Sequence, residues 1–177
     1  MKKRSYILQN HKKEESDIRV EASLEIEALE IKINFKILGN IKKYQFPKKE
    51  KQQRANELWR ETCFELFFTI ENDSDKYYEI NISPTSKWNV YHFDSYREGI
   101  SEVANILPPS IKIIKERDSI EFSVRIQFLR KEVLNQIDTF NLATILLDHY
   151  EVRHFYTIQK REGSVDFHDR ANWKTKN

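Results

Sequence analysis

Hydrophobic and polar residues alternate along much of this chain with the period of two that is typical of β-strands. The first alternating run covers residues 18–26. The alternation then shifts by one residue, continues over 29–37 and stops at Gly39-Asn40. Because such a shift exchanges the two faces of a strand, it indicates a turn or a bulge. The N-terminal part of the chain is therefore predicted to form two consecutive strands.

Turn residues separate further alternating runs in the rest of the chain. The pattern predicts hairpins over 60–83, 111–126 and 141–159, a strand over 88–93, one or two short helical turns over 129–135, and a long lysine-rich loop over 41–57. About ten short strands of this kind predict an all-β fold. The wide, aromatic apolar faces favour an antiparallel sandwich over a closed barrel. We expect one domain over 1–177, because no linker, repeat or change of composition divides the chain.

Charge and composition narrow the range of partners. Lys and Arg number 30 and Asp and Glu 28, and the net charge of +2 gives little long-range attraction for nucleic acid. No apolar run reaches the roughly 18 residues that span a bilayer, and residues 1–13 lack the apolar region of a secretory signal. Cys63 is the single cysteine, which fits a reducing compartment. We therefore expect a cytoplasmic protein that uses neither nucleic acid nor a membrane as partner.

Polar side chains gather on one face of the predicted 60–83 hairpin. If the apolar residues of this hairpin face the core, Glu65, Glu79 and Asn81 lie on the opposite face, and Arg125 has the same position in its own strand. Such a face offers many hydrogen-bonding groups and suits a polyhydroxylated ligand. The alternative is an ordinary solvent-exposed face with charged cross-strand pairs.

Aromatic and charged residues near these strands are further candidates for a ligand site. Trp59, Trp88 and Trp173 suit stacking against a sugar ring, but they suit core packing equally well. Tyr96-Arg97 follows a strand, where the guanidinium is able to hold a carboxylate or to form an internal salt bridge.

The densest polar cluster near the C-terminus is Asp166-Phe167-His168-Asp169. It suits either the cap of a binding face, with His168 at the ligand, or a turn whose polar groups bond to one another.

Motifs for metal, cofactor or catalysis are weak. The five histidines lack zinc-site spacing, and 73–75 resembles half a calcium loop without its glycine and closing glutamate. We therefore predict no metal site and no cofactor. The sequence holds no nucleophile elbow, P-loop or dinucleotide motif. Glu65 and Glu79 on adjacent strands leave a glycosidase as the remaining catalytic alternative.

The central block also carries a family resemblance. Leu58-Trp59-x-x-Thr62-Cys63-Phe64-Glu65-Leu66-Phe67, Tyr78-x-Ile80-Asn81-Ile82-Ser83-Pro84, Trp88, and Tyr96-Arg97-x-Gly99 resemble the bacterial DOMON-like proteins, which are related to the family-nine carbohydrate-binding modules. The resemblance implies an immunoglobulin-like β-sandwich that binds haem or sugars without catalysing a reaction. It implies that Trp59 and Glu65 belong to the ligand site, and it places Trp88, Tyr96 and Arg97 at family-typical positions.

Two departures limit what this resemblance implies. The family's His-Pro pair before Asp-Phe-His is replaced by Gln159-Lys160-Arg161. The haem-binding relatives use an axial methionine, and the single methionine here is Met1, so haem of that type is disfavoured while ligation by two histidines stays open.

The sequence therefore predicts a non-catalytic domain that binds a carbohydrate or sugar-like metabolite. A protein-interaction module, acting through the sheet edges or the 41–57 loop, is the main alternative.

Overall fold

The computed structural model describes residues 3–12, 16–27, 29–70, 75–129, 137–160 and 162–175, which fold almost entirely into strands. The strands are β1 (Arg4–Asn10), β2 (Ile18–Ile26), β3 (Glu30–Gly39), β4 (Gln53–Arg54), β5 (Cys63–Ile70), β6 (Tyr77–Ile82), β7 (Lys87–Phe93), β8 (Ser101–Glu102), β9 (Ser110–Lys115), β10 (Ser119–Gln127), β11 (Ile137–Leu147), β12 (Arg153–Thr157) and β13 (Lys174–Thr175). The all-β expectation and the predicted hairpins are confirmed. No helix among these residues is long and apolar enough to cross a membrane.

The helical content differs from the expectation of one or two turns. Three single turns of 3₁₀ helix lie within the described ranges, namely η1 (Ile41–Lys43), η2 (Leu58–Arg60) and η4 (Arg170–Asn172). The helical turns expected over 129–135 fall outside the described residues, apart from Leu129. The predicted 41–57 loop is largely irregular, and within it the short strand β4 pairs in parallel with β7.

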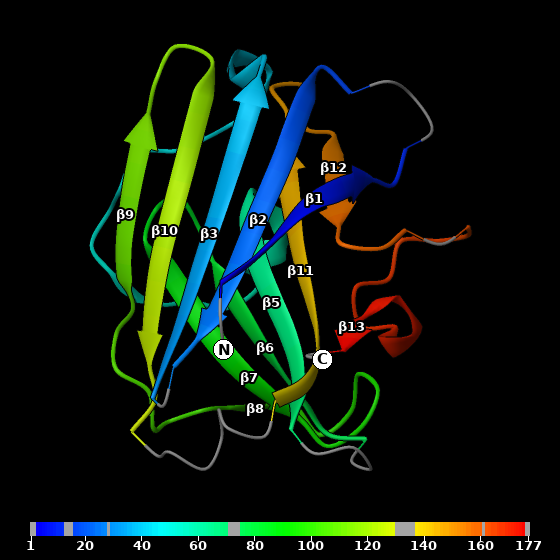
Figure 1. Cartoon of the computed structure of the whole chain (residues 1–177). Helices are drawn as coiled ribbons and strands as arrows, with labels where there is room; N and C mark the ends of the chain where they lie inside the picture. The colour runs from blue at the N-terminus through cyan, green and yellow to red at the C-terminus, as the bar shows by residue number, and fades with distance from the viewer. Residues whose placement is uncertain are drawn as a thin grey trace.

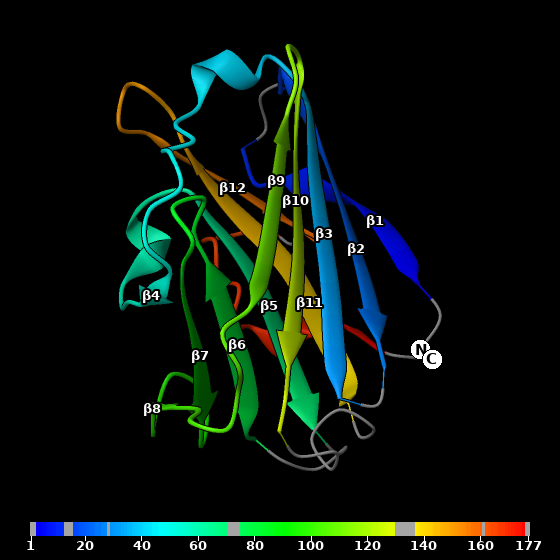
Figure 2. The same cartoon turned by 90° about the vertical axis from the view of Figure 1, so that its left-hand side faces the viewer.

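The strands form one continuous ladder in the order β4-β7-β6-β5-β11-β12-β1-β2-β3-β10-β9, with β8 beside β7 and β13 beside β11. This sheet curls on itself into a half-barrel. Figure 1 shows β2, β3, β9 and β10 in front of β5, β6, β7 and β11, and Figure 2 shows the two layers from the side. The continuous curled sheet does not clearly match an immunoglobulin-like sandwich, in which two separate sheets pack face to face.

The reason for this continuity is β1, which the sequence pattern did not predict. Residues 4–8 pair with β2, and the next two residues, Gln9 and Asn10, pair with β12. The strand therefore passes from one half of the sheet to the other. Leu8 is the one buried residue in this strand. Most positions of β1 therefore have no need to be apolar, and the sequence shows no clear alternation that predicts a strand.

The main core fills the space between the two halves of the sheet. Phe64 of β5 lies against Phe122 of β10, with ring centroids 4.2 Å apart, and against Phe35 of β3 at 5.0 Å. Leu66 and Phe68 follow Phe64 on the same inward face of β5. Because side chains alternate along a strand, the other residues of β5 face away from this core, as the sequence predicted.

A second hydrophobic cluster covers that outward face. It contains Phe67, Tyr77, Tyr91, Phe93, Ala143, Ile145, Phe167 and Trp173. The C-terminal segment, 162–175, supplies Phe167 and Trp173, and the Trp173 indole N–H donates to the Phe167 carbonyl at 2.9 Å. This segment also pairs with β11 through β13. The outward face of β5, β6 and β11 is therefore a second interior rather than a solvent-exposed surface.

Candidate functional site

A groove lies on the outward face of β5 and β6, beside the second cluster. It consists of two adjoining cavities of about 460 and 240 Å³. Both cavities are lined by Trp59, Glu79, Arg97 and His168, so they form one groove. Asn81 also lines the first cavity, and Glu65 also lines the second. The sequence predicted all six of these residues as ligand-binding, and the structure brings them together.

The floor of the groove is polar and almost fully buried. Glu65 lies directly opposite Asn81 in the β5–β6 ladder, and Glu79 lies opposite Phe67. Their exposed fractions are 2% for Glu65, 6% for Glu79 and 2% for Asn81. The Asn81 amide Nδ2 donates to Glu79 Oε1 at 2.6 Å. Within the part of the chain that the structure describes, Glu65 Oε1 and Asn81 Oδ1 have no hydrogen-bond partner, and such orphaned buried acceptors call for an explanation.

Burial changes the protonation of the two carboxyl groups. Desolvation raises the pKa of Glu79 to about 7, although the hydrogen bond from Asn81 and the charge of Arg97 oppose the rise. Desolvation and then the charge of Glu79 hold the pKa of Glu65 well above its usual range. Near neutral pH the floor therefore carries less negative charge than its two carboxyl groups suggest.

A strained turn after β7 presents Arg97 to the groove. The Asp94 N–H donates to the Glu98 carbonyl at 3.0 Å and closes the turn. Arg97 has a φ of 58° and Gly99 a φ of 64°, which is the left-handed region. A Cβ on Gly99 would collide with the Asp94 side chain, so this position requires glycine. The turn therefore depends on Gly99, the last residue of the Tyr96-Arg97-x-Gly99 motif.

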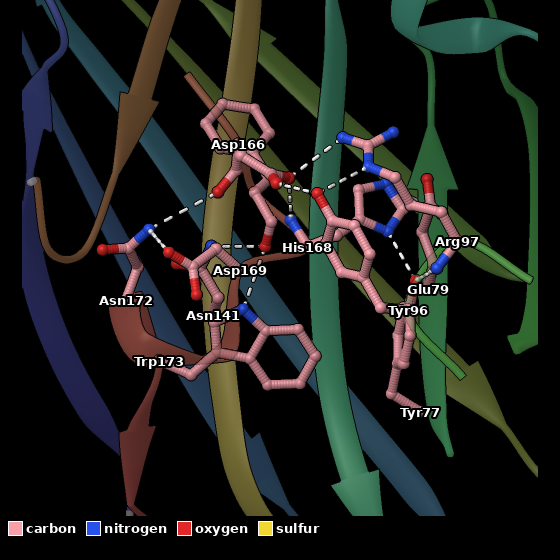
Figure 3. A network of polar contacts seen from close by, with 11 residues as sticks. Tyr77, Glu79, Tyr96, Arg97, Asn141, Asp166, His168, Asp169, Asn172 and Trp173 are labelled. Carbon is pink, nitrogen blue, oxygen red and sulfur yellow. Dashed lines mark hydrogen bonds and ion pairs between the residues drawn. The ribbon is translucent and has the colours of Figure 1, made fainter. Parts of the chain in front are cut away.

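The Arg97 side chain is held by the C-terminal segment. Its Nη2 lies 2.9 Å from Asp166 Oδ1, its Nε donates to the Tyr96 hydroxyl at 3.3 Å, and the Tyr96 hydroxyl in turn donates to Asp166 (Figure 3). Burial raises the pKa of Asp166, but the hydrogen bonds from Tyr96 and Arg97 outweigh it and the net shift is downward. Asp166 is therefore an anion that fixes Arg97 at the groove wall.

His168 contacts Glu79 without forming an ion pair at neutral pH. Its Nε2 lies 3.9 Å from Glu79 Oε2. Desolvation and then the charge of Arg97 lower the pKa of His168 to about 4. The ring is therefore neutral near pH 7, and its contact with Glu79 is not a salt bridge. The Tyr77 hydroxyl accepts from the Arg97 backbone N–H at 3.1 Å and lies 2.7 Å from His168 Nδ1. This favours donation from Tyr77 to Nδ1, with the ring proton on Nε2.

Trp59 forms the rim of the groove. It belongs to η2, and its side chain is 41% exposed. The guanidinium groups of Arg60 and Arg153 lie over the ring at 5.2 and 5.6 Å. The indole is therefore oriented by two cations while part of it stays open to a ligand.

Sequence reasoning missed several residues that line the first cavity. Asn56 Oδ1 accepts from the Tyr91 hydroxyl at 2.6 Å and from Asn89 Nδ2 at 2.9 Å, and Asn89 Nδ2 also donates to Glu102 Oε1 at 2.9 Å. The alternation of β7 was the available signal, because Asn89 and Tyr91 face opposite to the inward Val90. Asn56 and Glu102 carry no such signal, since they lie in or beside loops.

Three sequence candidates lie elsewhere. Trp88 is in the main core, where the Arg54 guanidinium stacks over its ring at 4.4 Å, because its position on β7 points inward. Arg125 is exposed on β10 in the other half of the sheet, opposite Lys32, so it cannot hold Glu65. Tyr96 lines neither cavity and contacts the groove through Arg97 and Asp166.

Metal ligation finds no support in the described part of the chain. It contains no group of three or more His, Cys, Asp or Glu residues placed to hold a metal ion. The acidic 73–75 sequence lies outside the described residues except for Asp75.

Comparison with known proteins shows that the fold of this chain resembles that of a solved structure. Neither a protein-family model nor a curated protein sequence matches the chain. A proposed carbohydrate-binding protein from Bacteroides uniformis matches with a TM-score of 0.66 and 14% identity over 97% of this chain and 84% of its own. A family 9 carbohydrate-binding module from Caldicellulosiruptor kristjanssonii matches more weakly. Its complex with cellotriose has a TM-score of 0.46 and 10% identity over 90% of this chain and 74% of its own. Its complex with glucose has a TM-score of 0.44 and 12% identity over 89% and 76%. At these identities the first match shows a shared fold alone, and no family is assigned to the chain.

Proposed function

We propose that this chain is a non-catalytic domain that binds a carbohydrate or a sugar-like metabolite in the groove. The observation that carries the proposal is the pair of orphaned acceptors, Glu65 Oε1 and Asn81 Oδ1, beside the half-open indole of Trp59. Sugar hydroxyls donate to such acceptors, while the apolar face of the ring packs on an indole. The cavity of about 460 Å³ lies within the range of small-molecule sites.

The fold likeness supports the proposal without carrying it. The Bacteroides uniformis protein that shares the fold is named for carbohydrate binding, but one fold hosts many functions. We also propose, from the sequence resemblance alone, that the chain is related to the DOMON-like proteins and has an immunoglobulin-like arrangement of strands. A cytoplasmic location is also a proposal, supported by Cys63 as the single cysteine.

Calorimetric titration with neutral, acidic and amino sugars tests the function. We expect at least one sugar to bind, and we expect Trp59→Ala and Arg97→Ala to weaken its binding about tenfold, which corresponds to roughly 1.4 kcal/mol. Arg125→Ala removes an exposed arginine from the other half of the sheet, and Tyr150→Ala removes a ring that is 84% exposed. These two matched controls should leave the affinity unchanged. Absence of binding across the panel, or equal binding by the Trp59 variant, would refute the proposal.

A glycosidase is the second candidate, because two carboxyl groups with raised pKa values, on neighbouring strands, line the groove. Hydrolysis of chromogenic glycosides that is lost in Glu65→Gln would favour it over simple binding. A protein-interaction module has less support. The edge strand β9 carries Lys112 and Lys115, and lysines on an edge disfavour the addition of another strand.

A further inference from the structure

Two polar side chains on the first cavity's side of the floor donate hydrogen bonds inside the protein. Asn81 Nδ2 donates to Glu79 Oε1 at 2.6 Å. The Tyr91 hydroxyl donates to Asn56 Oδ1 at 2.6 Å. A ligand that enters here therefore meets Arg97 and His168 as donors at the groove wall, while the floor itself offers mainly acceptors.

The acceptors of the floor, in contrast, remain available. Glu65 Oε1 and Asn81 Oδ1 find no hydrogen-bond partner among the described residues, although the exposed fraction of each residue is only 2%. Glu65 lines the second cavity, Asn81 the first and Glu79 both. A buried acceptor without a donor costs free energy, so the floor is suited to a group that donates in several directions.

Among the described residues, no protonated side chain forms an ion pair with the two glutamates of the floor near neutral pH. Within the described residues, the ion pairs of Glu79 consist of the contact with His168, which is neutral near pH 7. The charge of Arg97 acts on both glutamates, but its guanidinium is bonded to Asp166 and Tyr96. An incoming positive charge would therefore meet two carboxyl groups that no protein cation contacts closely.

We infer, on the basis of the proposed function, that the ligand is an amino sugar whose protonated primary amine lies against Glu65, Glu79 and Asn81. An ammonium group has three N–H donors and no acceptor, which matches three neighbouring acceptors. A hydroxyl or an acetamido group donates only one hydrogen there and brings acceptors that the floor does not satisfy. The remaining sugar ring then packs against Trp59.

Protons compete with the amine for the same carboxyl groups. The titratable and charged groups that act on Glu79 are Cys63 and Glu65 on β5, Tyr77 on β6, Tyr91 on β7, Arg97 after β7, and His168 from the C-terminal segment. Because a bound ammonium favours the ionised carboxylates, the affinity for an amino sugar should rise from about pH 5 to about pH 7. A neutral sugar should bind with little change over the same range.

Titration of the whole chain with matched sugars tests the inference. Glucosamine, galactosamine and mannosamine are each compared with the N-acetylated form and with the neutral hexose at about pH 6.5, where the amine is protonated. We expect one free amine to bind roughly tenfold or more tighter than both of its counterparts, since charged hydrogen bonds are about twice as strong as neutral ones. Glu79→Gln and Glu65→Gln should each remove most of that advantage. Glu121→Gln makes the same charge change on β10, outside the groove, and should not alter it.

The outcomes separate this inference from the function on which it rests. Equal or tighter binding of the neutral or N-acetylated sugars would overturn the amine while leaving carbohydrate binding intact. Absence of binding by every sugar, acidic ones included, would overturn both. The comparison among sugars uses the unaltered protein, so it decides the matter even where a variant fails to fold.

Discussion

The outward faces of the two halves of the sheet follow the same alternating pattern and have opposite environments. On β3, Lys32 lies 2.6 Å from Glu27 and within 4 Å of Glu25 and Glu30, and its side chain is 33% exposed. On β5 and β6, Glu65 and Glu79 are almost fully buried. The first face carries partly exposed ion pairs, and the second holds carboxyl groups whose pKa is raised.

The difference comes from what lies on top of each face. Residues 162–175 cover β5, β6 and β11 with Phe167 and Trp173 and bring His168 and Asp166 to the groove. Removing water from a carboxyl group penalises its charged form, so the cover sets the chemistry of the glutamates. An alternating strand thus specifies two faces, while the packing of a remote segment decides which face becomes a site.

The largest expected effect comes from removing the cover. Trp173→Ala deletes a ring that is 7% exposed and contacts Tyr77 and Phe67, with centroids 5.7 and 6.0 Å apart. We expect the free energy of unfolding to fall by about 3–5 kcal/mol, measured by urea denaturation. Tyr150→Ala, at an exposed ring, should change it by less than about 0.5 kcal/mol. A similar loss in both variants would show that the second cluster does not stabilise the fold.

The next effect concerns the raised pKa of Glu79. The folded protein keeps this proton up to about pH 7, whereas the unfolded chain releases it near the usual range, so stability is lost as the pH rises through 7. Glu79→Gln should therefore be more stable than the unaltered protein at about pH 8, by on the order of 3 kcal/mol, and similar to it below about pH 4. Thermal denaturation across this pH range measures the difference. Glu121→Gln keeps Glu79, so this control should lose stability with rising pH as the unaltered protein does.

His168 should give the opposite slope over nearly the same pH range, so its effect is seen as a change of slope in the variant. Its pKa is lowered to about 4, so between about pH 4 and 6.5 the unfolded chain binds more protons and stability rises with pH. His168→Gln keeps a polar partner for the Tyr77 hydroxyl and should remove that rise, by on the order of 3 kcal/mol across the range. Denaturation midpoints at several pH values test this. An unchanged slope in the variant would mean that His168 is not buried as described.

The smallest effect is expected at the surface ion pairs. Lys32→Ala removes the contacts with Glu27, Glu25 and Glu30. Exposed ion pairs are screened by water and salt, so the denaturation midpoint should not change measurably in about 0.15 M salt. A clear fall in the denaturation midpoint of Lys32→Ala would contradict the contrast between the two faces.

The outward position of Glu65, Glu79 and Asn81 was predictable from their strands, because side chains alternate between the two faces and the inward residues of β5 and β6 are apolar. The placement of Trp88 was not, since a tryptophan is equally suited to a core and to a ligand site. Arg125 was misplaced for a different reason. Its strand alternates like β5, but β10 pairs with β3 and β9 rather than with the strands of the groove, and pairing between distant strands leaves no local signal.

The sequence by itself determined that this chain is all-β, where most strands begin and end, and which side chains share a face, because these follow from local backbone geometry and a period of two. Only the tertiary structure decided that the sheet is continuous through β1, that residues 162–175 cover one of its faces, and that six residues from β5, β6, η2, a turn and the C-terminal segment meet in one groove. Those features depend on contacts between residues far apart in the chain, and burial at such contacts, rather than residue type, determines the charge of Glu65 and Glu79.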